Sequence, residues 1–128
     1  MSEDNSKEFS VYKKNGIMYC ICPTGIVTLE NITNAIKRRI ELAEGKAHPI
    51  FIDARTVKYW TLESRRYGFS KAAHQCANSY GVVINYHIQE VLLNWAIKMF
   101  PTTIPQKMFT NEQEAIKWLQ KYVDKEQD

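Results

Sequence analysis

Glycine and proline are scarce in this 128-residue sequence, at 5 and 4 residues, which excludes a collagen-like or low-complexity chain. The 3 cysteines are too few, and odd in number, for a disulfide scaffold. No apolar run approaches the roughly 20 residues of a membrane-spanning helix, because the richest stretch, residues 91–100, is interrupted by Asn94 and Lys98. A hydrophobic content of 45% and a charged content of 24% instead indicate one globular domain.

Positive charge is in small excess overall but is unevenly distributed. The net charge of +3 is too low for the concentrated basic surface of a nucleic-acid-binding protein. Residues 37–71 contain nine basic and four acidic side chains, which gives this segment an excess of +5. Such a segment is either a solvated helical face or a surface that meets an anion.

The polar residues 1–8 lack the apolar core of a signal peptide. We expect a disordered lead-in at residues 1–8, one domain at residues 9–123 and a short tail at residues 124–128. Free cysteines without an export signal predict a cytoplasmic protein.

The order of predicted elements indicates an α/β fold. Asn15-Gly16 separates two β-rich runs and predicts a hairpin. Thr28 is the expected N-cap of a helix, and a capping box from Thr110 to Gln113 is expected to open the last one. The predicted strands are residues 9–14, 17–22, 49–54, 80–86 and 106–109, and the predicted helices are residues 29–43, 62–78, 88–100 and 110 onwards. This alternation after a hairpin predicts a mixed, mainly parallel sheet covered by helices.

Metal binding and catalysis are disfavoured by the spacing of the reactive residues. His74 and Cys76 lie two apart in a predicted helix and would point about 200° away from each other. Cys20 and Cys22 share one strand face but lack the usual Cys-x-x-Cys spacing, and are better explained as buried small hydrophobes. No phosphate-binding loop or nucleophile motif is present. We therefore predict no metal, no cofactor and no catalytic residue.

The start of the second helix is the candidate regulatory site. Thr61 is either a simple N-cap or a hydroxyl whose phosphorylation would be stabilised by free backbone amides, and Ser64 lies one turn further on. Arg65 and Arg66 follow and would pair with an added phosphate. Asp53 ends the most buried-looking strand, where functional groups often gather, and Arg55 follows it as a further candidate contact to an anion or partner.

The predicted helix at residues 88–100 has a broader apolar surface than one buried face requires. Its polar stripe is only Glu90, Asn94 and Lys98. We interpret the excess as the face of a homodimer or higher homo-oligomer, with burial inside the fold as the alternative. The predicted oligomer face consists of Leu92, Leu93, Trp95, Ile97, Met99 and Phe100.

Four stretches in this order and spacing resemble the SpoIIAA-like branch of STAS-type domains, the superfamily of the bacterial anti-sigma factor antagonists. They are Gly25-Ile-Val-Thr-Leu-Glu30, His48-Pro-Ile-Phe-Ile-Asp53, Thr61-Leu-Glu-Ser-Arg-Arg66 and the closing run at residues 108–119. The resemblance covers residues 9–123. It implies a sheet of four or five strands with about four helices mainly on one face, and no catalytic machinery.

The resemblance also implies how such a protein works. In the antagonists a serine in an Asp-Ser-Ser-Gly-like motif at the start of the second helix is phosphorylated, which switches partner binding. This sequence instead reads Tyr59-Trp-Thr-Leu-Glu-Ser64, with Thr61 as the hydroxyl nearest that position. The first functional hypothesis is therefore a non-enzymatic regulatory or scaffold module that contacts a protein partner.

The second hypothesis is a small-molecule or lipid-binding module, because the SpoIIAA-like branch also resembles Sec14-type lipid-binding domains in fold. The basic middle segment would then meet the anionic group of a small apolar or anionic ligand. The expected cavity aromatics are Tyr59, Trp60, Tyr67, Phe69 and Trp95.

Overall fold

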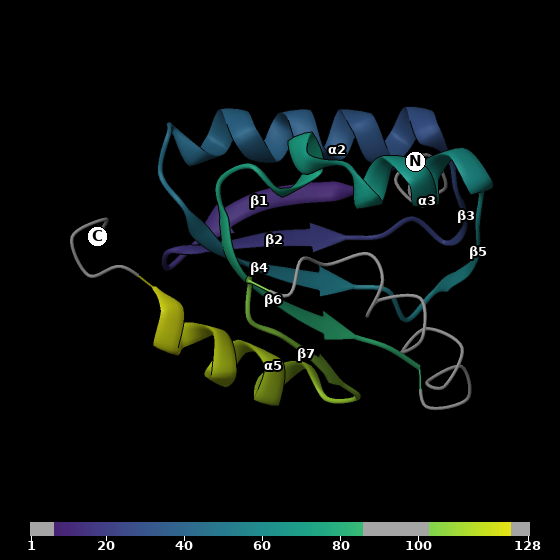
Figure 1. The fold of residues 1–128 in the computed structure, drawn as a ribbon. Coiled ribbons are helices and arrows are strands. Elements are labelled where there is room, and N and C mark those ends of the chain that lie inside the picture. Colours follow the sequence, from purple (N-terminus) through teal and green to yellow (C-terminus); the bar gives the residue numbers. More distant parts are fainter. Residues whose placement is uncertain (1–6, 86–102, 124–128) are drawn as a thin grey trace.

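The computed structural model describes residues 7–85 and 103–123 (Figure 1). These residues form a five-stranded sheet, with strand order β1-β2-β4-β6-β7, and a separate two-stranded sheet of β3 and β5. The strands are β1 (Ser10–Lys14), β2 (Ile17–Ile21), β3 (Gly25–Val27), β4 (His48–Asp53), β5 (Val57–Trp60), β6 (Ala77–Val83) and β7 (Gln106–Phe109). The α-helices are α2 (Leu29–Ala43), α3 (Leu62–Phe69) and α5 (Glu112–Leu119), with short 3₁₀ helices at Lys71–His74 and Gln120–Tyr122.

The main sheet has the predicted mixed topology. β1 pairs antiparallel with β2, whereas the β2–β4, β4–β6 and β6–β7 pairs are parallel. Asn15 and Gly16 adopt φ values of 53° and 81° in the connection between β1 and β2. Both lie in the left-handed region that a two-residue hairpin turn requires, which confirms the predicted hairpin.

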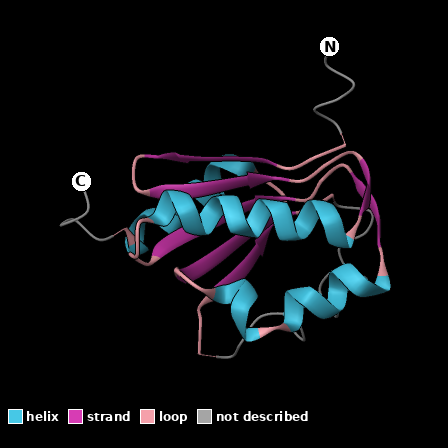
Figure 2. Cartoon of the chain, turned by 90° about the horizontal axis from the view of Figure 1, so that it is seen from above, coloured by secondary structure: helices cyan, strands magenta, loops and turns pink. Residues whose placement is uncertain are grey.

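Helices cover both faces of the main sheet (Figure 1). Met18 and Ile50 point to one face, where they join the core beneath α2 with Ile36. Alternate strand residues such as Tyr19 point to the other face and pack with Leu119 of α5. Figure 2 shows α2 running along the strands above the first of these faces. Because helices cover both faces, the centres of the inner strands are continuous apolar runs, such as Ile50–Ile52 in β4, and polar residues such as Asp53 and Asn78 lie near the strand ends.

The first helix follows its prediction closely. Thr28 Oγ1 accepts a hydrogen bond from Asn31 N at 3.2 Å, and Asn31 Oδ1 accepts one from Thr28 N at 3.0 Å. This reciprocal pair is a capping box. The helix ends at Ala43, where Glu44 and Gly45 take positive φ values of 53° and 80°.

The predicted capping box of the last helix is wrong. The N-cap is Asn111, whose Oδ1 accepts a hydrogen bond from Glu114 N at 3.0 Å. Thr110 lies one residue too early, because β7 extends to Phe109, whose carbonyl accepts a hydrogen bond from Ile84 N at 2.9 Å. Asn111 is an equally good cap chemically, so the error lies in position rather than in residue type.

The second helix is much shorter than predicted. It ends at Phe69, because Ser70 leaves the helical conformation and its Oγ accepts a hydrogen bond from Ala73 N at 3.3 Å. Cys76 then takes a φ of 63°, and β6 starts at Ala77. His74 and Cys76 therefore do not share an α-helix, and Asn78 lies in a strand.

Two strands were not predicted, and one predicted helix lies outside the described residues. β3 and β5 are only three and four residues long. Residues 88–100 fall within the gap at 86–102, so the predicted oligomer face and Trp95 lie outside the described residues. Three α-helices are found in the described ranges, against about four expected.

Candidate functional site

The two-stranded sheet brings two helix starts together. β3 leads into α2 and β5 leads into α3, and the two strands run parallel, side by side, at one end of the molecule (Figure 1). Gly25 N donates to Thr56 O at 3.0 Å, and Thr61 N donates to Val27 O at 3.1 Å. The two strand–cap–helix units therefore lie in register, with Ile26 opposite Tyr59 and Val27 opposite Trp60.

Both units carry the same short sequence. Thr28-Leu29-Glu30 directly follows β3, and Thr61-Leu62-Glu63 directly follows β5. In each, the threonine is the N-cap and the leucine is the first helical residue. The repeated Thr-Leu-Glu is the sequence signal from which the paired helix starts could have been predicted.

An exposed apolar surface results from this pairing. Relative exposures are 55% for Ile26, 42% for Leu29, 55% for Tyr59 and 48% for Leu62. Within the described residues only one other large apolar side chain, Tyr12 on β1, is comparably exposed. We call these four residues the β3–β5 patch. Exposed apolar side chains that gather in one place, unlike scattered ones, mark interaction surfaces.

Thr61 and Ser64 play different parts beside this patch. Thr61 Oγ1 accepts a hydrogen bond from Ser64 N at 3.1 Å, so Thr61 is an N-cap. Ser64 is 0% exposed, and its Oγ donates to Thr61 O at 2.8 Å. Thr61 is half-buried, so of the two candidate phosphoacceptors it is the one a modifying enzyme reaches without unfolding the helix start.

Exposed basic residues occur along β5 and α3 and just after them. Lys58, Arg66 and Lys71 are exposed, whereas Arg65 is half-buried. The Nε atom of Arg65 is buried and has no hydrogen-bond partner among the described residues. Glu63 is the acidic residue of this stretch, so residues 57–71 carry four basic side chains against one acidic.

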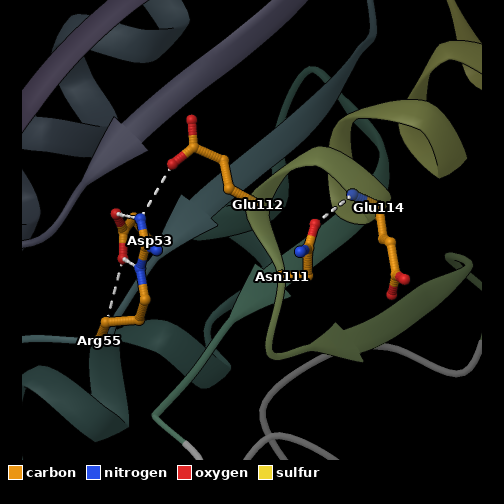
Figure 3. Close-up of polar contacts among 5 residues, drawn as sticks. All are labelled: Asp53, Arg55, Asn111, Glu112 and Glu114. Atoms are coloured by element: carbon orange, nitrogen blue, oxygen red, sulfur yellow. Dashed lines mark hydrogen bonds and ion pairs between the residues drawn. The ribbon is translucent and has the colours of Figure 1, made fainter.

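Asp53 and Arg55 pair with each other and with Glu112 of the same chain, so they do not form an open site for an anion (Figure 3). Asp53 Oδ2 lies 2.7 Å from Arg55 Nη2, and its Oδ1 accepts from Arg55 Nε at 2.9 Å. The same Nη2 lies 2.9 Å from Glu112 Oε1 at the start of α5. Two carboxylates already neutralise Arg55, so this cluster ties the end of β4 to α5.

The charge of Asp53 depends on Arg55. Burial by itself raises the pKa of Asp53, but the hydrogen bonds and charge of Arg55 outweigh it and lower that pKa below its usual value. A carboxyl group with a lowered folded-state pKa stabilises the fold above its unfolded pKa of about 4, and this stability is lost as the pH falls through the folded pKa.

We therefore expect Asp53→Asn to lower the free energy of unfolding at pH 7 by about 1 kcal/mol, since the pair is partly exposed. The deficit relative to wild type should shrink below pH 4. Urea denaturation at pH 7 and at pH 3 measures both values. Glu63→Gln, which removes a carboxylate with no ion pair in the described residues, is the control. A deficit that persists unchanged at pH 3 would contradict the assignment.

A small cavity lies between α2, α3 and the main sheet. Its volume is about 60 Å³, and its lining is almost entirely apolar. Trp60 of the predicted aromatic set lines it, whereas Tyr67 packs against the neighbouring core and Tyr59 belongs to the exposed patch. The side chains of Phe69 and Trp95 lie outside the described residues.

The cysteines on β2 and beside it are buried free thiols. Burial raises the pKa of the Cys20 thiol to about 11 and that of Cys22 well above its usual value. Both stay protonated near neutral pH, as small core residues do. In residues 7–85 and 103–123 no group of three His, Cys, Asp or Glu side chains is placed to hold a metal ion. Over the same ranges no helix is long and apolar enough to cross a bilayer.

Comparison with known families matches residues 11–123 to the model of a domain of unknown function, DUF7793. The chain belongs to the DUF7793 family. No curated protein matches it. Among solved structures, this DUF7793 domain is similar to an uncharacterised protein of the DUF3478 family with a SpoIIAA-like fold, from Shewanella loihica PV-4.

That likeness concerns the fold. The TM-score is 0.61 at 15% sequence identity, over 87% of this chain and 91% of the other. The DUF7793 domain described here therefore has a SpoIIAA-like fold, which confirms the resemblance inferred from the sequence.

Proposed function

We propose that this DUF7793 protein is a regulatory or scaffold module that acts through protein–protein contacts and catalyses no reaction of its own. The β3–β5 patch carries the proposal, because four of the five exposed large apolar side chains in the described residues gather there. In this SpoIIAA-like domain the β3–β5 pairing places two helix starts side by side at one end of the molecule, where they present the patch to a partner.

The surroundings of the patch define the partner that it fits. Protein interfaces combine an apolar centre, often with tyrosine, and a polar rim. Here Ile26 and Tyr59 pair across β3 and β5, and the exposed Arg66 follows Leu62 by one helical turn on α3. The partner we propose is a protein with an apolar contact surface bordered by acidic side chains, whose binding weakens as the salt concentration rises.

Thr61 is the proposed switch for this contact. A phosphate there would meet the free amides at the start of α3, while placing negative charge between the patch and its partner's acidic rim. Modification would therefore preserve the fold and weaken partner binding.

Thr61→Asp and Thr61→Asn separate charge from capping. Both replacements can cap a helix, so both should retain the stability of the wild type to within about 0.5 kcal/mol. The aspartate alone adds charge, and we expect it to weaken partner binding about tenfold relative to the asparagine variant, by titration with the purified partner. Equal affinities for the two variants would rule out a charge switch at Thr61.

Native mass spectrometry of the protein purified from its own cells tests the proposal as a whole. A species containing this chain and a second, different protein supports it, provided that a Tyr59→Asp variant loses that species. A mass increase of one phosphoryl group per chain would support the switch. Multiples of the chain mass alone would contradict a distinct partner and favour the homo-oligomer expected from residues 88–100.

A further inference from the structure

The cavity beneath α2 contains an unusual group. Its lining is formed mainly by apolar side chains such as Ile36, Ile50 and Trp60. Arg39 is the only charged residue among the described lining residues. The cavity volume of about 60 Å³ corresponds to about four water molecules, or to a ligand of a few carbon atoms.

Arg39 is almost completely buried, with 3% exposure. Its Nη2 donates to Ala73 O at 3.0 Å and to Gln75 O at 2.6 Å. Its Nε is buried and has no hydrogen-bond partner among the described residues. The ion pairs found in these residues involve Arg55 and not Arg39.

The ionisable neighbours of Arg39 do not neutralise its charge. Burial raises the pKa of Tyr80 to about 12 and that of Cys20 to about 11, so both are uncharged near pH 7. His74 Nε2 lies 2.9 Å from Gly68 O, which can only accept, so Nε2 carries the proton. His74 Nδ1 then accepts from the Tyr80 hydroxyl at 2.6 Å. Tyr80 also forms a side-chain hydrogen bond with Arg39, so among the described residues these contacts link Arg39 to the carbonyl of Gly68 without meeting a carboxylate.

A buried arginine without a carboxylate partner is costly, and an anion in the cavity would offset that cost. We propose that this cavity binds a small aliphatic carboxylate, with its carboxylate group on Arg39 and its apolar tail along Ile36 and Ile50. A single positive charge, whose Nε has no partner among the described residues, suits a monoanion better than a phosphate, and the rest of the lining suits a hydrocarbon tail. This inference does not depend on the β3–β5 patch or on its partner.

A titration of the full-length protein with butyrate, monitored by the backbone amide signals in NMR spectra, tests the proposal. We expect butyrate to shift amide signals of α2 and β6, and to bind at least tenfold more tightly than butan-1-ol or butylamine, which share its tail but not its charge. Arg39→Gln should weaken butyrate binding at least tenfold. Arg38→Gln removes an exposed positive charge from the adjacent position and should leave binding unchanged.

Ala35→Leu provides a second variant that keeps Arg39. Ala35 lines the cavity and is buried, so a larger side chain should fill the space and abolish binding even if Arg39→Gln folds poorly. Butyrate binding that survives both variants would overturn the proposal. So would equal binding of butan-1-ol, or no binding of butyrate at any concentration, which would indicate that water alone satisfies Arg39.

Discussion

Tyr59→Asp is expected to weaken partner binding about 100-fold while leaving the fold intact. Tyr59 lies on β5 with 55% of its surface exposed, at the centre of the β3–β5 patch. Buried tyrosines at the centre of an interface contribute about 2–4 kcal/mol, and an aspartate adds the cost of burying a charge. Isothermal titration with the copurified partner measures the change, and circular dichroism checks the fold.

Tyr12→Asp is the matched control for this variant. Tyr12 is the other exposed tyrosine of comparable exposure in the described residues, at 42%. It lies on β1, stacked on Tyr19 at 5.0 Å between ring centroids, away from the paired helix starts. We expect its replacement to cost some stability but no partner affinity. Equal losses of affinity in the two variants, or none in either, would contradict a docking role for the patch.

Leu119→Ala is expected to lower the free energy of unfolding by about 2–5 kcal/mol, the cost of emptying a buried leucine site. Leu119 of α5 is fully buried against Gly81 of β6. A Cβ atom at position 81 would lie 3.0 Å from both Cγ and Cδ1 of Leu119. Gly81→Ala alone should therefore cost about 1–3 kcal/mol through overpacking.

The double variant makes this prediction specific. The methyl group that Gly81→Ala adds would occupy part of the space that Leu119→Ala leaves, so the double variant should be more stable than the sum of the two losses predicts. Urea denaturation of all four proteins gives the coupling energy. Lys117→Ala, at an exposed position on α5, should change little. Strictly additive losses would show that α5 does not pack on Gly81 in solution.

Local signals explain which parts of the fold were predictable. Asn15-Gly16 and Thr28 act through their own backbone geometry, so the hairpin and the start of α2 follow from the sequence. The end of α3 depends on Ser70 forming a local hydrogen bond that competes with the helix, and a helical pattern does not reveal such competition. The strands β3 and β5 are short and pair with each other across about 30 residues of sequence. Neither can therefore be recognised as a strand from its own sequence before its partner is known.

The candidate sites also differ in how far local sequence signals predict them. Thr61 was identifiable as a cap from its own side chain, but the patch beside it arises only when β3 and β5 pair. Arg39 lies in the basic segment at residues 37–71, which was predicted to be either a solvated helical face or a surface that meets an anion, and neither alternative places it in the core. Its position nevertheless continues the buried stripe of Ile32, Ile36 and Ala43 at helical spacing, a signal that charge alone obscured.

Hydrogen–deuterium exchange of the free protein and of its complex with the copurified partner tests the proposed function most directly. Slowed exchange of backbone amides at residues 25–30 and 57–66, with little change on β1 or α5, is the result expected from docking on the β3–β5 patch. Protection confined to β1 or α5, with unchanged exchange at both helix starts, would show that the partner binds elsewhere and would contradict the proposed function.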